Sequence, residues 1–128
     1  MLQRITIHIT WDWEEDMEFF FQQACTEVPE SSNLWFDFFK VMPSFNGYCR
    51  LIYWGVLEDP VVTFNADKAR ESGVIGIQWE EDCTFPLPML EALAYRHPNL
   101  TITATGSETN ATFYHRGNQR KNSDVQEA

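Results

Sequence analysis

Carboxylates and tryptophans gather in two short, similar stretches of the sequence. Residues 10–20 read TWDWEEDMEFF, and residues 78–85 read QWEEDCTF. Clustered carboxylates can hold a hard metal ion, move protons as an acid and base pair, or attract a basic partner. The residues that carry this question are Asp12, Trp13, Glu14, Glu15, Asp16, Glu18, Glu80, Glu81 and Asp82, with Trp11 and Trp79 beside them.

The spacing of these acids gives little support to metal binding or catalysis. A calcium loop needs ligands at a defined period around a glycine turn, and neither stretch has one. The sequence holds no nucleophile elbow, phosphate-binding loop or zinc-protease helix motif. Its histidines, His8, His97 and His115, stand alone. We therefore expect no enzymatic activity, no catalytic residues, no metal and no cofactor.

The composition indicates an acidic protein that repels nucleic acid. The chain has 128 residues, a formal net charge of −10 and a pI near 4.5. Residues 1–113 hold 17 of the 19 acids and six of the nine bases, a net charge of −11. Such a domain should repel nucleic acid and anionic lipid and attract basic protein surfaces. The basic segment from Arg116 to Lys121 has no assigned role.

Cysteine usage and hydropathy indicate a reducing compartment. Cys25, Cys49 and Cys83 are widely spaced among apolar neighbours, without a C-x-x-C motif. The N-terminus is typical of a strand rather than a signal peptide, and no apolar run is as long as a membrane span. We expect reduced, buried thiols and a location in the cytoplasm of a bacterial host.

Two strand–helix–strand units are predicted along the chain. Ile5, Ile7 and Ile9 alternate with polar residues, as in a half-buried strand over residues 4–10. Asp12 stands three residues before Glu15, a capping-box-like start for a helix that Pro29 should end. The buried stripe of this helix is expected to comprise Met17, Phe20, Phe21, Ala24, Cys25 and Val28.

The remaining elements complete an α+β pattern. Strands are expected over 34–43, 48–56, 60–67, 74–80, 100–106 and 111–115, with a polar connection or one helical turn at 68–73. Pro86 and Pro88 should open a second helix that Pro98 stops. The predicted fold is ferredoxin-like, βαβ–(inserted strands)–βαβ, with an antiparallel or mixed sheet and two helices on one face. We expect a single domain over residues 1–117 and a flexible polar tail over 118–128.

Spaced aromatic residues and prolines over residues 34–117 resemble the YubB ferredoxin-like domain family of plasmids and phages. The matching features are Phe36-Asp37-Phe38 with Pro43, Trp54-Gly55, and Trp79 followed by Pro86 and Pro88; His97-Pro98 replaces the family's Phe-Pro. Two departures, VLEDP at residues 56–60 and the EED after Trp79, both add negative charge. The resemblance implies the fold, an origin in a mobile element and no known catalysis.

The predicted topology would bring the two acidic stretches together. In this topology we expect the first strands of the two units to lie side by side and parallel, so that their carboxyl ends share one rim. Eight carboxylates should then gather there, with the two stretches roughly 10 Å apart. Tryptophans on that rim could anchor a partner. The functional hypothesis is an acidic, mobile-element inhibitor that binds a basic surface, such as an anti-CRISPR protein that competes with DNA for a CRISPR effector or another bacterial defence nuclease.

Two other interpretations of the acids stay open. Carboxylates in the first turn of a helix are favourable on their own, at about 0.3–1 kcal/mol each, so part of each run could be ordinary helix starts. Alternatively, the acidity only keeps the protein soluble, and the protein is a non-catalytic structural or assembly module of a phage or plasmid. The oligomeric state is open under every interpretation.

Overall fold

Strand β1 (Gln3–Thr10) is half-buried, as its alternating side chains predict, and it lies between two other strands of the larger sheet. The computed structural model describes residues 2–41, 62–81, 85–108 and 110–118, except for the side chains of Phe39 and Glu81. Ile5, Ile7 and Ile9 have no exposed surface, whereas the residues between them are exposed or half-buried. One face of the sheet is therefore buried and the other meets solvent.

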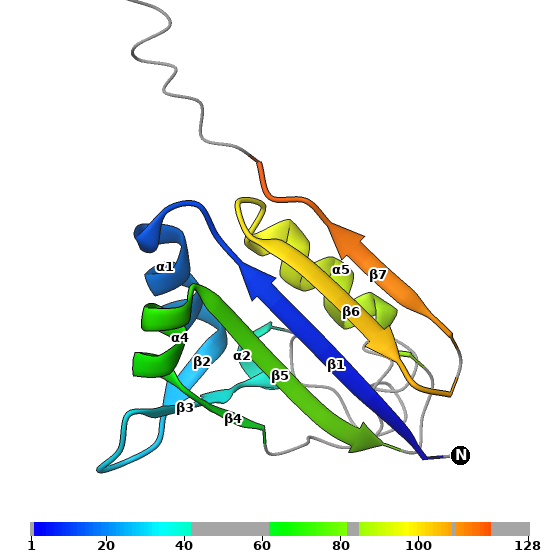
Figure 1. The fold of residues 1–128 in the computed structure, drawn as a ribbon, viewed down its shortest axis with the longest axis horizontal. Coiled ribbons are helices and arrows are strands. Elements are labelled where there is room, and N and C mark those ends of the chain that lie inside the picture. Colours follow the sequence, from blue (N-terminus) through cyan, green and yellow to red (C-terminus); the bar gives the residue numbers. More distant parts are fainter. Residues whose placement is uncertain (1, 42–61, 82–84, 109, 119–128) are drawn as a thin grey trace, which may run out of the picture.

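The larger sheet is antiparallel throughout. Its order is β5 (Val74–Glu81), β1, β6 (Thr101–Gly106) and β7 (Thr112–His115), with β5 and β7 at the edges (Figure 1). Strands β5 and β6 lie on either side of β1 and are each antiparallel to it, so they run parallel to each other. Helix α5 (Leu87–Arg96) connects them, which makes a split βαβ unit.

The first unit does not return to this sheet. After helix α1 (Glu14–Ala24) the chain enters a small antiparallel sheet of β2 (Cys25–Glu27), β3 (Asn33–Phe36) and β4 (Thr63–Asn65). A ferredoxin-like fold interleaves two split units, and the described residues contain one. The fold is α+β with antiparallel sheets, and the two parallel crossovers expected from the sequence are reduced to one.

Helix α1 buries the stripe that its sequence predicts, but both of its ends differ from the prediction. The N-cap residue is Trp13 rather than Asp12, and no side-chain hydrogen bond caps the helix. The helix also ends at Ala24 instead of continuing to Pro29, because Cys25 pairs with Phe36 and begins β2. Sheet pairing therefore overrides the helical period that the sequence continues to Val28.

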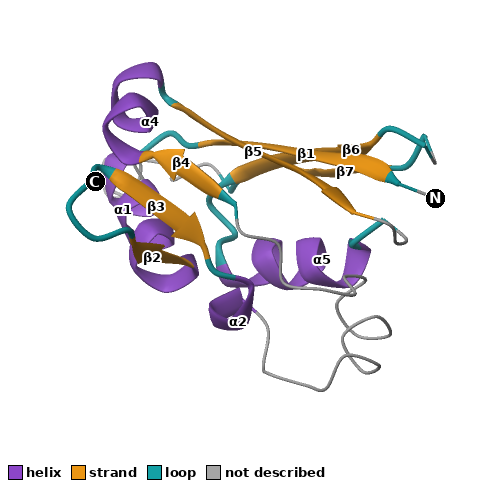
Figure 2. Ribbon diagram, turned by 90° about the horizontal axis from the view of Figure 1, so that it is seen from below, coloured by secondary structure: helices purple, strands orange, loops and turns teal. Residues whose placement is uncertain are grey.

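Helices α1 and α5 cover the same face of the larger sheet (Figure 2). Leu90 and Leu93 of α5 are fully buried, and Pro88 lies in its first turn, as predicted. The core that they form with the sheet also includes Ile75, Ile77, Trp79, Met89, Leu100, Ile102 and Ala104. The opposite face, rich in threonine, stays uncovered by any described element.

Short helical segments replace part of the strand predicted over 34–43 and the end of the strand predicted over 60–67. The strand expected over 34–43 stops at Phe36 and continues as α2 (Phe38–Val41). The connection expected at 68–73 belongs to α4 (Ala66–Ser72), which Asn65 caps and Gly73 ends with φ of 79°, a conformation that suits glycine. The predicted strand at 48–56 and most of the predicted tail, residues 119–128, lie outside the described residues.

Candidate functional site

The first acidic stretch lies at the start of α1. Glu14, Glu15 and Asp16 form the first turn of the helix, where the helix dipole favours negative charge. Asp12, Glu14 and Glu15 are exposed, whereas Asp16 and Glu18 are half-buried. The five predicted acids of this stretch thus lie along the start of α1, and those at its N-terminal end are exposed to solvent.

Two aromatic side chains are exposed among these acids. Trp13 is 39% exposed and Phe19 is 48% exposed, which is high for large apolar residues. Trp11 is instead partly buried and packs against the core. Aromatic residues surrounded by a polar rim are the usual anchors of protein–protein interfaces, and Trp13 and Phe19 have acidic residues around them.

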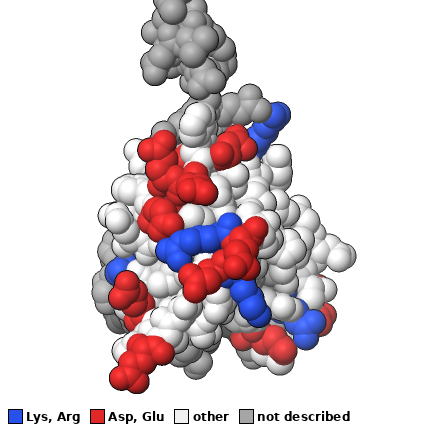
Figure 3. Space-filling model, turned by 60° about the vertical axis from the view of Figure 1, so that its left-hand side comes forward, with Lys and Arg blue, Asp and Glu red and all other residues white. Residues whose placement is uncertain are grey.

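Arg70 of α4 neutralises the C-terminal part of the acidic stretch. Its Nε lies 2.8 Å from Glu18 Oε2, and its Nη1 lies 3.2 Å from Asp67 Oδ1. The guanidinium also covers the Phe21 ring, 5.1 Å from the ring centroid. Its hydrogen bonds hold the pKa of Glu18 below the usual value. Figure 3 shows a face of the molecule on which basic side chains lie between acidic ones.

The second acidic stretch is not near the first. Strands β1 and β5 are antiparallel, so Thr10 lies opposite Val74 and Arg4 lies opposite Glu80. The strand length at about 3.4 Å per residue separates the two ends by roughly 24 Å. The expectation that eight carboxylates share one rim is therefore wrong. It fails because it treated these two strands as parallel.

At its own end of the sheet, the second stretch is partly neutralised. Arg4 Nη2 lies 3.6 Å from Glu80 Oε1, and both side chains are more than half exposed. Trp79 is buried at 7% exposure and belongs to the core rather than to a surface. The side chain of Glu81 and the whole of Asp82 lie outside the described residues. Of the predicted partner-binding residues, those of the first acidic stretch are therefore the stronger candidates for a binding surface.

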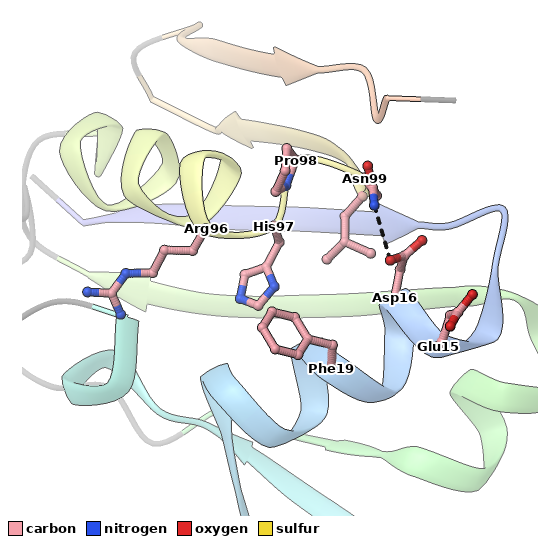
Figure 4. Close-up of a pocket in the computed structure, with 8 residues that line it drawn as sticks. Glu15, Asp16, Phe19, Arg96, His97, Pro98 and Asn99 are labelled. Atoms are coloured by element: carbon pink, nitrogen blue, oxygen red, sulfur yellow. Dashed lines mark hydrogen bonds between the residues drawn. The ribbon is translucent and has the colours of Figure 1, made fainter. Parts of the chain in front are cut away.

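A pocket of about 390 Å³ lies beside this surface, where the first turns of α1 meet the end of α5 (Figure 4). Asn99 Nδ2 donates a hydrogen bond to Asp16 Oδ1 at 3.2 Å and so links the two elements. Arg96 points away from the acids and donates from Nη1 to the Lys40 carbonyl oxygen at 2.6 Å. The pocket is lined by Glu15, Asp16, Phe19, Arg96, His97, Pro98, Asn99 and Leu100.

His97 is the least typical residue of the pocket. It is only 4% exposed, and its Nδ1 atom has no hydrogen-bond partner among the described residues. The rings of Phe19 and Phe20 both lie 5.4 Å from the imidazole centroid in edge-to-face geometry. An unpaired buried polar atom costs about 1–3 kcal/mol, so this nitrogen is an unusual feature of a folded protein.

Burial keeps the His97 ring neutral. Removal from water, with a smaller contribution from the positive charge of Arg96, lowers the pKa of His97 to about 4. A neutral imidazole has one nitrogen that donates and one that accepts a hydrogen bond. At neutral pH the pocket therefore offers the carboxylates of Glu15 and Asp16 together with an uncharged ring.

Sequence reasoning did not identify this pocket. It placed His97 at a helix end and treated it as an isolated residue, and it did not single out Phe19, Arg96 or Asn99. The sequence did place His97 on the apolar side of the second helix, four residues after Leu93, but not in a site. Nothing in that spacing relates it to Asp16, which lies 81 positions earlier.

Other kinds of site find no support in the part of the chain that the structure describes. Among those residues, no group of three or more His, Cys, Asp or Glu side chains could hold a metal ion. Within the same ranges, none of the helices combines the length and the apolar character needed to cross a membrane. Cys25 is buried and unpaired, and burial raises the pKa of its thiol to about 12. Cys49 and Cys83 lie outside the described residues.

Comparison of the chain with protein-family models, curated protein sequences and solved structures finds no match. The resemblance to the YubB family therefore stays a prediction.

Proposed function

We propose that this protein binds a basic protein surface through the start of α1. The observation that carries the proposal is the combination of exposed acids, Asp12, Glu14 and Glu15, with two exposed aromatic anchors, Trp13 and Phe19. Solubility alone would account for the charge but not for large apolar rings exposed within it. We call these five residues the α1 surface.

The second acidic stretch has a smaller part in this proposal. Arg4 neutralises Glu80, and the partner would have to extend along the whole length of β1 to reach both stretches. A standard interface buries about 800 Å² on each partner, so a large partner could cover both, but the α1 surface is sufficient for a smaller one. Contacts through residues 80–82 would then contribute to the binding free energy independently of contacts through the α1 surface.

The most concrete form of the proposal is inhibition by competition with DNA. Nucleic-acid-binding clefts carry the basic surfaces that an acidic domain attracts most strongly. On this basis the partner is a bacterial defence nuclease such as a CRISPR effector, in the manner of an anti-CRISPR protein of a phage or plasmid. The ferredoxin-like relationship and a cytoplasmic location belong to the same proposal.

The test is displacement of DNA from a panel of purified bacterial nucleases. The intact protein should release DNA from its target, and release should weaken as salt rises, because surface charges are screened over about 10 Å at 0.1 M. The variant D12K/E14K/E15K should lose the effect. A matched control, E30K/E91K/E108K, changes the net charge equally at exposed positions elsewhere and should retain it. Equal loss in both triple variants would show that only net charge matters.

An assembly module is the second candidate, and one observation favours it. On α5 and β7, Tyr95 is 88% exposed, Tyr114 is 65% exposed and Leu87 is 43% exposed. These side chains lie outside the α1 surface. Sedimentation of the intact chain over a range of concentrations distinguishes the two functions: self-association that Y95A/Y114A abolishes, without DNA displacement from any nuclease, would favour assembly.

A further inference from the structure

We propose that the pocket between α1 and α5 receives the guanidinium group of an arginine side chain from the basic partner. The inference rests on the proposed function for the identity of the partner, and it adds the group by which that partner is recognised. It involves Glu15, Asp16, Phe19, His97 and Asn99.

The charges of the pocket favour a cation. Glu15 and Asp16 place two carboxylates in the first turn of α1, at one end of the pocket (Figure 4). The one basic residue among the described lining residues, Arg96, lies at the other end and is bonded to the Lys40 carbonyl. The hydrogen bond from Asn99 Nδ2 to Asp16 Oδ1 orients the Asn99 amide, whose carbonyl oxygen is by its chemistry a hydrogen-bond acceptor.

His97 supplies an independent indication of a ligand. Its side chain is more than nine-tenths buried, lines the pocket and has an unpartnered nitrogen, Nδ1, among the described residues. In the tautomer protonated on Nε2, this nitrogen is an acceptor for an N–H donor. Because the ring is neutral, it adds no positive charge that would oppose a cation. Phe19 lies against the imidazole, with ring centroids 5.4 Å apart, and is half exposed, so an apolar ring borders His97 at the mouth of the pocket.

The shape and number of these groups suit a guanidinium better than an ammonium. A guanidinium is planar, carries five N–H donors and is weakly hydrated, whereas an ammonium is compact and strongly hydrated. It can bond to a carboxylate, an amide oxygen and an imidazole nitrogen at the same time while it stacks on the Phe19 ring. A volume of about 390 Å³ holds such a group together with its aliphatic stem.

The experiment titrates the full chain with N-acetyl-L-arginine amide and follows the His97 ring protons and the Asn99 side-chain amide by NMR. Saturable shifts of both are expected. The citrulline analogue, which has the same shape without charge, should bind about tenfold more weakly, because charge-assisted hydrogen bonds are roughly twice as strong as neutral ones. Equal binding of citrulline, or no shift of either residue, would overturn the proposal.

Variants assign the binding to the pocket. H97F and N99L should each weaken arginine amide binding about fivefold, since each removes one hydrogen-bonding group. H8F, which changes an exposed histidine on the open face of the sheet, should bind as the natural chain does. If H97F does not fold, N99L alone decides, and unchanged binding by N99L would contradict the assignment.

A second probe separates this inference from the proposed function. Deca-arginine should bind the natural chain and lose affinity in both H97F and D12K/E14K/E15K. The pocket would be refuted if deca-arginine bound H97F and the natural chain equally and did not shift the His97 resonances of the natural chain. The proposal that the partner is basic would be unaffected. The reverse outcome is also informative. If arginine amide binds in the pocket but the protein displaces DNA from none of the nucleases, the pocket is supported and the proposed function is not.

Discussion

The imidazole ring of His97 stands edge-on to the Phe20 ring, with centroids 5.4 Å apart and an interplanar angle of 78°. Phe20 has no exposed surface and in turn stacks on Phe36 of β3 at 6.1 Å. The end of α5, the middle of α1 and the small sheet thus share one aromatic cluster. Protonation of His97 would therefore place a charge inside the cluster that joins these three elements.

The first prediction concerns the pH dependence of stability. In the unfolded chain His97 binds a proton below about pH 6.5, but in the folded protein its pKa is about 4. The stability due to the neutral ring is complete above pH 6.5 and is lost as the pH falls from 6.5 to 4. The gap corresponds to roughly 3 kcal/mol at most.

Urea unfolding of the natural chain and of H97F between pH 4 and 8 checks this. The difference between their free energies of unfolding isolates His97, because both chains contain the same carboxylates. That difference should move in favour of H97F by up to roughly 3 kcal/mol as the pH falls from 6.5 to 4. A difference independent of pH would show that His97 is not buried in its neutral form.

The second prediction concerns the buried stripe of α1. F20A should lower the free energy of unfolding by about 3–5 kcal/mol, because it removes a fully buried ring and leaves a cavity. F19A, one position away, alters a half-exposed ring and should cost much less. Thermal and urea unfolding provide both values, and similar losses in the two variants would mean that the face of the helix is assigned incorrectly.

The third prediction concerns the two acidic stretches. Because they lie at opposite ends of the sheet, D12K/E14K/E15K and E80K/E81K/D82K should have additive effects on binding to a basic partner. Sites more than about 7–10 Å apart that share no contacts usually add within about 0.3–0.5 kcal/mol. Calorimetry with deca-arginine gives the coupling energy. Strong coupling would indicate that one partner group contacts both stretches.

The fourth prediction concerns Arg70. In R70A the pKa of Glu18 should rise toward its ordinary value, because the hydrogen bond that lowers it is lost. The ion pair is partly exposed, so its loss should cost only about 0.2–1 kcal/mol, and that contribution is present above the usual pKa of Glu18 and disappears at acid pH. Carbon NMR of the Glu18 carboxyl during an acid titration measures the change. R70K, which keeps the charge, is the control.

The fifth prediction concerns Cys25. With its thiol pKa raised to about 12, Cys25 should react very slowly with iodoacetamide at pH 8 in the folded protein and rapidly in urea. Peptide mapping by mass spectrometry follows this cysteine separately from Cys49 and Cys83. Rapid alkylation of Cys25 in the native protein would show that β2 opens readily.

The sequence by itself determined the buried faces of β1 and α1. The alternation of Ile5, Ile7 and Ile9 predicts β1, and the spacing of Met17, Phe20 and Phe21 predicts the core face of α1. These periods depend only on local backbone geometry, with a repeat of two residues in strands and 3.6 in helices. Local pattern likewise predicted that a helix starts within the first acidic stretch.

Only the tertiary structure decided the direction of the strands and the existence of the pocket. An alternating strand has the same pattern whether its neighbour is parallel or antiparallel, so the sequence did not show that Glu80 lies beside Arg4 rather than near Thr10. In the same way, the contact of Asn99 with Asp16 and the burial of His97 arise from the packing of α1 against α5. Such contacts between distant segments leave no periodic trace in either segment alone.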